Sequence, residues 1–189
     1  MTNQELLDLF QEMGVLQTGH FKLTSGRHSA QYMQCATLFE HPLLAAQVIQ
    51  ELLPRLPESI DIVVAPAIGG INAGYELARA LGCRFIFAER QDGVMTLRRG
   101  FNLSPTEDVL VVEDVVTTGG SVREVLEIVH DAGCKIQGVA AIVDRSGGNV
   151  DFGVPFASLM SVDIETYNPT ECPLCLNKVP ITKPGSRST

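Results

Sequence analysis

Three features that are missing from the sequence limit the kind of protein that it encodes. The chain of 189 residues has no apolar run near the roughly 20 residues that a membrane-spanning helix needs. Its first residues, MTNQELLDLFQEM, have neither the basic nor the apolar segment of a secretory signal. Basic residues are scarce, with 14 Lys and Arg against 22 Asp and Glu, for a net charge of −8. We therefore expect a cytoplasmic protein that binds neither membranes nor nucleic acid, since a general nucleic-acid binder presents a basic face.

Cysteine is sparse and odd in number, with five residues in the chain, so a framework of disulfides is not expected. Two of the five form a C-x-x-C pair in ECPLC, namely Cys172 and Cys175. A zinc site usually needs four ligands, and neither a second such pair nor a nearby pair of histidines follows. A redox motif would sit where a strand meets a helix, whereas Pro169 and Pro173 indicate a loop. Structural thiols are therefore our first interpretation, ahead of a shared metal site and of a redox pair.

Histidine is also rare, and its four positions show no spacing that is typical of metal ligands. They are His20, His28, His41 and His130. His28 could approach a substrate, but we expect it to lie in a solvated loop.

The composition that is present is that of one globular domain. Apolar residues make up 45% of the chain and charged residues 19%, which suffices for one sizeable core. Apolar periodicity predicts helices over residues 3–13, 43–53, 71–81 and 121–132. Strands are predicted over residues 60–65, 84–89, 108–114 and 136–145. These strands are continuous apolar runs that alternate with helices, which indicates an α/β fold with a parallel sheet flanked by helices. The tail after Tyr167 is predicted to be irregular.

The segment LVVEDVVTTGGSVREV, residues 110–125, carries the strongest functional pattern. Ser121 and Glu124 have the spacing of a capping box, which predicts that Ser121 is the N-cap of a helix. Residues 117–120 would then lie between a strand end and a helix N-terminus, where free backbone N–H groups and the helix dipole favour an anion. The two glycines allow the backbone to curve around a phosphate. The segment is no Walker A loop, because it lacks the G-x-x-x-x-G-K-[ST] pattern.

Two adjacent acids, Glu113 and Asp114, come at the end of the strand that leads into this loop. Two carboxylates would repel a phosphate unless another group lies between the acids and the phosphate. The vicinal hydroxyls of a ribose could donate to them, or a divalent metal could bind oxygen ligands there. The alternative is a Gly-rich turn with solvated acids.

The string VLVVEDVVTTGGS resembles the phosphoribosyl pyrophosphate (PRPP) signature of the type I phosphoribosyltransferases. The resemblance implies that the acids hold the ribose hydroxyls and that the loop cradles the 5-phosphate. It assigns PRPP binding to Glu113, Asp114, Val115, Val116, Thr117, Thr118, Gly119, Gly120 and Ser121. It also implies the fold of that family, a parallel sheet flanked by helices with an N-terminal hood. Residues 1–189 would form a single domain, with the hood built from residues 1–40 and the C-terminal tail.

Four further segments resemble the orotate phosphoribosyltransferases, in that family's order. GHFKLTSGRHSAQYMQ (19–34) is similar to the segment that covers the orotate and pyrophosphate end of the site, with its core at Phe21, Leu23, Ser25, Gly26 and Ser29. PAIGGINAGYELA (66–78) resembles the pyrophosphate loop, and FAERQDGVMTLRRGF (87–101) takes the place of the mobile catalytic loop. AAIVDRSGG (140–148) resembles the segment whose Arg meets the orotate carboxylate. That Arg is Arg145, and Thr117 is the matching Thr of the PRPP loop.

Two anionic partners are possible for Arg145, the orotate carboxylate and a nearby acid of the chain. An Arg reads a carboxylate through two parallel hydrogen bonds, and orotate carries a carboxylate that uracil lacks. An ion pair with Asp144 or another local acid is the alternative.

The chain departs from the family pattern at several basic positions. Many members carry Lys where this sequence has Thr24 and Gly69. The segment 85–101 has no Lys or His, although Arg90 aligns with the family's loop Arg. Arg98 or Arg99 is the candidate to replace the missing catalytic Lys. We therefore expect pyrophosphate contacts from Ala67, Ile68, Gly69, Arg98 and Arg99. Catalytic roles are expected for Arg90 and Asp114, and Arg90 is also expected to bind PRPP.

The resemblance implies a pentosyltransferase that joins orotate to PRPP and releases pyrophosphate. Mg²⁺ is expected to arrive with PRPP, without a direct protein ligand, and the protein is expected to be a homodimer. The segment 88–101 should close over the site and exclude water. Two alternatives remain: a phosphoribosyltransferase for another base, and a PRPP-sensing regulator without catalysis.

Overall fold

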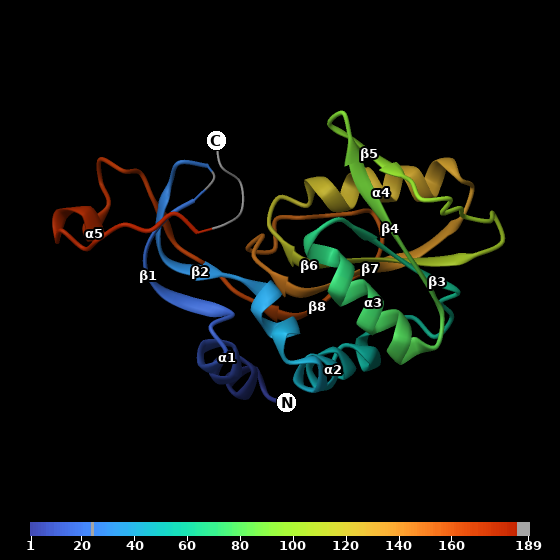
Figure 1. Cartoon of the computed structure of the whole chain (residues 1–189), viewed down its shortest axis with the longest axis horizontal. Helices are drawn as coiled ribbons and strands as arrows, with labels where there is room; N and C mark the ends of the chain where they lie inside the picture. Colours follow the sequence, from blue (N-terminus) through green and yellow to red (C-terminus); the bar gives the residue numbers. More distant parts are fainter. Residues whose placement is uncertain (24, 185–189) are drawn as a thin grey trace. The chain divides into compact units, whose positions relative to one another are not determined.

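The computed structural model describes residues 1–23 and 25–184, so Thr24 and residues 185–189 lie outside the description. The chain divides into two compact units (Figure 1). One unit comprises residues 38–162, and the other combines residues 1–37 with the segment from Asp163 onward. That residues 1–189 act as one domain with a hood stays a prediction.

The larger unit is built on a six-stranded sheet with the order β5-β4-β3-β6-β7-β8. Its strands are β3 (Ile62–Pro66), β4 (Arg84–Gln91), β5 (Val94–Leu97), β6 (Asp108–Val116), β7 (Lys135–Asp144) and β8 (Phe156–Ser161). All neighbours pair in parallel except β5, which pairs antiparallel with β4 at one edge. The predicted parallel α/β sheet is confirmed, while β5 and β8 were not predicted.

Helices cover both faces of this sheet (Figure 1). They are α2 (Pro42–Gln50), α3 (Gly69–Leu81) and α4 (Gly120–Asp131), with short 3-10 turns η1 (Cys35–Glu40) and η2 (Leu53–Arg55). From β3 the chain crosses through α3 to β4 on one side, and from β6 it crosses through α4 to β7 on the other. Because such crossovers are right-handed, the two helices lie on opposite faces. The carboxyl ends of β3 and β6 thus border the switch point where ligands bind in open α/β sheets.

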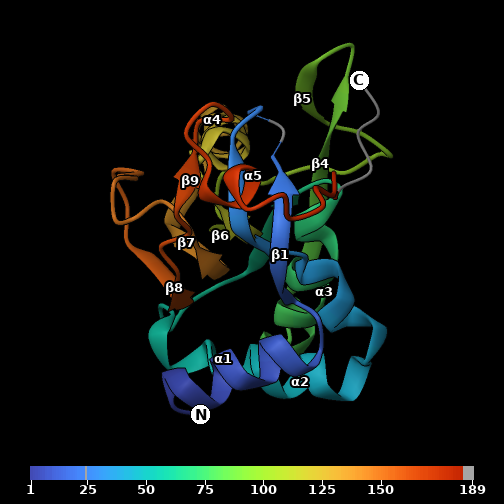
Figure 2. The same ribbon diagram turned by 90° about the vertical axis from the view of Figure 1, so that its left-hand side faces the viewer.

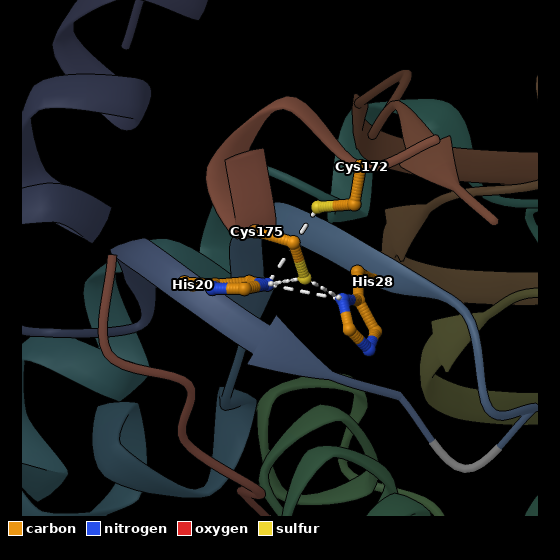
Figure 3. Close-up of side chains that lie close together, drawn as sticks. All are labelled: His20, His28, Cys172 and Cys175. Atoms are coloured by element: carbon orange, nitrogen blue, oxygen red, sulfur yellow. Dashed lines mark hydrogen bonds between the residues drawn. The ribbon is translucent and has the colours of Figure 1, made fainter. Parts of the chain in front are cut away.

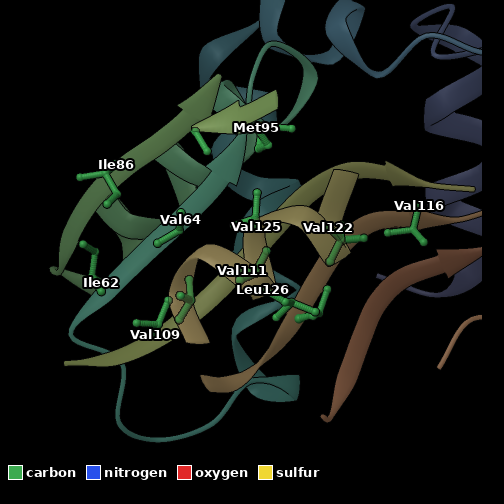
Figure 4. Packing of buried hydrophobic residues seen from close by; sticks show 14 residues of the cluster. Ile62, Val64, Ile86, Met95, Val109, Val111, Val116, Val122, Val125 and Leu126 are labelled. Atoms are coloured by element: carbon green, nitrogen blue, oxygen red, sulfur yellow. The ribbon is translucent and has the colours of Figure 1, made fainter. Parts of the chain in front are cut away.

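The core of the larger unit explains why its strands read as continuous apolar runs. Ile62, Val64, Val109 and Val111 of the two central strands are fully buried, and Val125 of α4 packs in the same cluster (Figure 4). All five residues of β3 and the last seven of β7 are buried. A strand covered on both faces needs apolar side chains at every position, so the pattern loses its alternation.

The smaller unit contains α1 (Asn3–Glu12) and a three-stranded antiparallel sheet with the order β1-β2-β9. Its strands are β1 (Leu16–Lys22), β2 (His28–Met33) and β9 (Thr166–Tyr167), and a short helix, α5 (Pro173–Leu176), follows (Figure 2). The helix predicted over residues 3–13 is confirmed, and Thr2 and Glu5 form its capping box. The prediction of an irregular tail after Tyr167 is wrong in part, because that tail forms α5 and a bridge from Thr182 to Phe21.

None of the helices within the described residues is long and apolar enough to span a membrane.

Candidate functional site

The acid pair lies at the carboxyl end of β6, against the first turn of α3. Glu113 and Asp114 are both partly buried. A Cβ placed on Gly69 would lie 2.7 Å from Asp114 Oδ1, and a Cβ on Gly70 would lie 3.0 Å from Glu113 Oε1. The turn after β3 and the end of β6 therefore meet at the switch point of the sheet, as two segments of the predicted site.

Backbone amides hold both carboxylates in place. The Asp114 amide donates to Glu113 Oε1 at 3.1 Å, and the Val115 amide donates to Asp114 Oδ1 at 2.8 Å. Burial, and then the neighbouring Asp114 carboxylate, raise the pKa of Glu113 to about 9. Glu113 is therefore protonated at neutral pH without ligand. The pair then repels a nearby phosphate less than two carboxylates would, and Glu113 can also donate a hydrogen bond.

The loop after the acids leads into α4, whose N-cap lies two residues before the predicted N-cap, Ser121. Gly119 is the N-cap, in the left-handed conformation with φ of 73°, and the cap has no side-chain hydrogen bond. The predicted capping box of Ser121 and Glu124 is therefore wrong. The helix begins at Gly120, and the Glu124 carboxylate instead accepts from Arg90, with 2.8 Å between Nη2 and Oε1.

This loop surrounds an open hollow of about 70 Å³, lined by Glu113 and the run from Val115 to Val122. The first N–H groups of α4 have no acceptor within the helix, and the helix dipole is positive at this end. Two features require glycine at position 119. Its φ is positive, and a Cβ there would lie 2.8 Å from the Phe152 ring. The hollow has the size and donors for a phosphate group.

The structure brings together the two residues predicted to bind orotate. Val116 of β6 pairs with Asp144 of β7, so Thr117 and Arg145 leave neighbouring strands at the same level. The Arg145 amide donates to the Val116 carbonyl at 2.7 Å. The Asp144 carboxylate accepts from the Ser146 amide at 2.8 Å. Arg145 thus leaves the sheet beside the 117–120 loop.

The turn between β3 and α3 carries the other predicted pyrophosphate contacts. The Ala67 amide donates to the Ala88 carbonyl at 2.7 Å, the Ala67–Ile68 peptide is cis, and Ile68 is 85% exposed. The helix predicted over residues 71–81 begins two residues earlier, so Gly69 is its first residue. Because Gly69 has no side chain, there is room beside it for the Asp114 carboxylate.

The predicted mobile loop, residues 88–101, is for the most part the β4–β5 hairpin. Asp92 and Gly93 both have positive φ at its tip, as a two-residue hairpin turn requires. Arg90 donates to the Gly93 carbonyl at 2.8 Å as well as to Glu124, and these contacts hold it against the hairpin and α4.

Arg98 and Arg99 share the carboxylate of Glu89. Arg99 donates two hydrogen bonds to it, at 3.0 and 3.1 Å, and Arg98 Nη1 lies 3.8 Å from Oε1. The Arg99 guanidinium also stacks over the Phe87 ring at 5.5 Å. The roles of Glu89 and Glu124 as partners of the loop arginines were missed, because nothing in the local sequence marks contacts between separate elements.

Known protein families and relatives of this chain agree with this geometry. A family model described as "Phosphoribosyl transferase domain" matches residues 34–151. A protein of Caldicellulosiruptor bescii named orotate phosphoribosyltransferase is 51% identical over 188 residues, covering 99% of each chain. The protein of that name from Caldanaerobacter subterraneus is 52% identical, again over 99% of each chain.

Solved structures share the fold at lower identity. Orotate phosphoribosyltransferase from Aeropyrum pernix has a TM-score of 0.71 at 24% identity, covering 83% of this chain and 93% of that one. The Mycobacterium tuberculosis enzyme, crystallised with inorganic phosphate, has a TM-score of 0.66 at 23% identity, with coverages of 84% and 95%. With an acid pair, a phosphate-sized hollow and full-length relatives at half identity, the chain belongs to the orotate phosphoribosyltransferase family.

Proposed function

We propose that the protein transfers the 5-phosphoribosyl group of PRPP to orotate, which gives orotidine 5′-phosphate and pyrophosphate. This pentosyl transfer is a step of de novo pyrimidine (UMP) synthesis. One observation carries the proposal: Glu113 and Asp114 meet the start of α3 at the switch point, and Glu113 also lines the hollow of the 117–120 loop, in a chain about half identical to its named relatives.

The acid pair would bind the ribose, and the loop would bind its 5-phosphate. A ribose hydroxyl can donate to Asp114, and the protonated Glu113 can accept or donate. Loss of pyrophosphate leaves positive charge on the sugar ring, as in other glycosyl transfers. The charge of Asp114 beside the ring would favour that state, which gives it a catalytic role.

Orotate would lie between the phosphate loop and the end of β7. Arg145 would bind its carboxylate through two parallel hydrogen bonds, and Thr117 would contact it from the neighbouring strand end. The nucleophile is a nitrogen of the base, which is already an anion. No nucleophile from the protein is therefore required.

Pyrophosphate would leave towards the β3–α3 turn, where Ala67, Ile68 and Gly69 offer backbone groups and the start of a helix. Arg90, Arg98 and Arg99 would add positive charge to the leaving group. Each of them pairs with Glu124 or Glu89 in this structure, so each must exchange a carboxylate for phosphate oxygens. Binding is then gained late in the reaction, when the charge on the leaving group grows.

Mg²⁺ is part of the proposal as an ion that arrives with PRPP. The Asp114 carboxylate at the end of β6 would offer oxygen atoms of the kind that such a hard cation prefers. When bound, the ion neutralises charge on the phosphates of the leaving group.

A steady-state assay with orotate, PRPP and Mg²⁺ tests the proposed function. Orotidine 5′-phosphate should form, no product should form once Mg²⁺ is removed, and adenine or uracil in place of orotate should give little product. Turnover of another base alone would replace orotate as the substrate. PRPP binding without turnover of any base would favour a PRPP-sensing regulator.

A homodimer and a cytoplasmic location are also proposed. Leu43 of α2 and Tyr75 of α3 are 85% and 61% exposed, and such large apolar side chains on adjacent helices suit a subunit interface. Light scattering coupled to size-exclusion chromatography should give twice the mass of the chain, and a monomer mass would contradict it.

A further inference from the structure

Four metal-binding side chains lie together in the smaller unit, in a cluster separate from the β6–α4 loop. His20 is on β1, His28 begins β2, Cys172 precedes α5 and Cys175 lies within it. One ligand atom from each residue lies within 4.8 Å of all the others. Figure 3 shows the two rings and two sulfurs turned towards one another.

The distances suit a tetrahedral site with two nitrogens and two sulfurs. Zinc binds sulfur at about 2.3 Å and nitrogen at about 2.0 Å, so the ligand atoms of a tetrahedron lie roughly 3.3–3.8 Å apart. His20 Nε2 lies 3.6 Å from Cys172 Sγ and 3.7 Å from Cys175 Sγ, and His28 Nδ1 lies 3.3 Å from Cys175 Sγ. The two ring nitrogens are 3.0 Å apart, and a small rotation of either ring brings them to the expected distance.

The far side of the His20 ring has the partner that a metal ligand needs. His20 Nδ1 lies 2.8 Å from the Val179 carbonyl, which can only accept. The proton of a neutral ring is therefore on Nδ1, and the lone pair of Nε2 faces the cluster. A backbone carbonyl that fixes the ring in this way is typical of metal-bound histidine.

A bulge in β1 is the reason that His20 points into the cluster. The register of β1 against β2 shifts between Thr18 and Phe21, which leaves an extra residue on β1. His20 and Phe21 are both buried as a result, although neighbouring residues of a regular strand face opposite sides. His28 is directly opposite Lys22, at the end of the same hairpin.

The turn of α5 presents the two sulfurs together. The Leu176 amide donates to the Cys172 carbonyl, so Cys172 and Cys175 are three residues apart on one helical turn. Cys172, His20 and His28 are buried, while Cys175 is exposed and leaves a path by which an ion can enter.

These contacts correct two expectations drawn from the sequence. His28 is 7% exposed and is not a solvated loop residue. The histidines that complete the C-x-x-C pair lie at the other end of the chain, where spacing cannot reveal them. Of the three interpretations of the pair, the shared metal site is the one that the geometry favours, ahead of structural thiols alone.

We propose that His20, His28, Cys172 and Cys175 bind one structural zinc ion. Four protein ligands leave no position for a substrate, which is typical of structural sites, and two sulfurs with two nitrogens select zinc among common divalent ions. The ion would tie the C-terminal tail to the β1–β2 hairpin. The tail already pairs with β1, since the Thr182 amide donates to the His20 carbonyl at 2.8 Å and the Lys22 amide donates to the Thr182 carbonyl at 2.8 Å.

The first measurement is the metal content of the full chain, purified without added metal or chelator. Inductively coupled plasma mass spectrometry gives this content. We expect about one zinc per chain. Cys172→Ser and Cys175→Ser should each lose most of that zinc, whereas the matched variants Cys83→Ser and Cys134→Ser, which change thiols in the larger unit, should keep it.

A second measurement does not depend on the folding of any variant. Co²⁺ exchanged into the unaltered protein should give the intense visible bands of tetrahedral coordination together with thiolate-to-cobalt charge transfer. A strong chelator should lower the melting temperature of the unaltered protein and of the two control variants. It should change those of Cys172→Ser and Cys175→Ser much less, because binding free energy contributes to folding.

Three results would overturn the proposal. One is a purified chain that holds no metal and takes up no Zn²⁺ in equilibrium dialysis. Another is an equal zinc content in the ligand variants and the controls. The last is a disulfide between Cys172 and Cys175 in the protein as isolated, which would favour a redox pair. Iron in place of zinc would refute the choice of metal.

Discussion

Gly69 and Asp114 approach each other so closely that no side chain fits between them. A Cβ on Gly69 would lie 2.7 Å from Asp114 Oδ1 and 3.0 Å from its Cγ. The contact joins the turn after β3 to the end of β6, which are far apart in the sequence and adjacent in the sheet.

Gly69→Ala should therefore displace the Asp114 carboxylate. We expect kcat/KM for PRPP to fall by about 10-fold or more, equivalent to about 1.4 kcal/mol or more of transition-state stabilisation. Asn72→Ala, at an exposed position of the same helix, is the control and should leave kcat/KM unchanged. Equal kinetics for the two variants would show that the close approach has no functional role.

Asp114→Asn removes the charge that we place beside the ribose. PRPP use should fall by about 100-fold, in the range of other electrostatic contacts to a transition state. The free energy of unfolding, measured by urea titration, should change much less. Lost stability with unchanged PRPP kinetics would make the acid pair a structural feature.

Glu113 should make the protein less stable as the pH rises. Its pKa is raised to about 9 in the folded chain, so the folded state holds a proton that the unfolded state releases at a lower pH. The stability that this gives is complete below the unfolded pKa and is lost as the pH rises through the folded pKa. Between pH 5 and pH 9 the parent should therefore lose stability relative to Glu113→Gln by about 1.4 kcal/mol for each pH unit, or roughly 5 kcal/mol in all.

Urea unfolding of both proteins at several pH values checks this, with Glu12→Gln, at an exposed position of α1, as the control. A difference between parent and Glu113→Gln that does not vary with pH would mean that the proton on Glu113 has no such role.

Arg145→Ala should raise the Michaelis constant for orotate. Losing one partner of a buried charge-assisted contact costs about 2–5 kcal/mol, which corresponds to at least roughly 30-fold in affinity. The Michaelis constant for PRPP should change little, because the Arg145 contact to Val116 is made by the backbone and is retained. Ordinary orotate kinetics in this variant would remove Arg145 from the site.

Arg90 is predicted to exchange Glu124 for the leaving pyrophosphate. Arg90→Ala should lower kcat by about 100-fold with little change in orotate affinity, because the contact is made in the transition state. Glu124→Gln should weaken the resting pair and lower the Michaelis constant for PRPP. Arg79→Ala removes an exposed Arg that pairs with Glu76 on α3, and should leave both constants unchanged. An unchanged rate after Ala replaces Arg90, Arg98 and Arg99 together would refute this role.

The sequence by itself determined the main helices, the buried strands and the loop that joins β6 to α4. The strands of the larger unit are continuous apolar runs because both faces of the sheet are covered, and that pattern is visible without a structure. The acids and the loop are adjacent in sequence, so their shared position at a strand end follows from one segment. Even there the N-cap was misplaced by two residues, since it is Gly119 and not Ser121, and Glu124 pairs with Arg90 instead of closing a capping box.

Only the tertiary structure decided which side chains meet across elements. The approach of Gly69 to Asp114, the pairing of Arg98 and Arg99 with Glu89, and the His20–His28–Cys172–Cys175 cluster all join separate segments. The β1 bulge that turns His20 inward leaves no mark in the composition of its strand. Such contacts depend on strand register and on the closing of long loops, and these are set by the free energy of the whole fold and not by local preference.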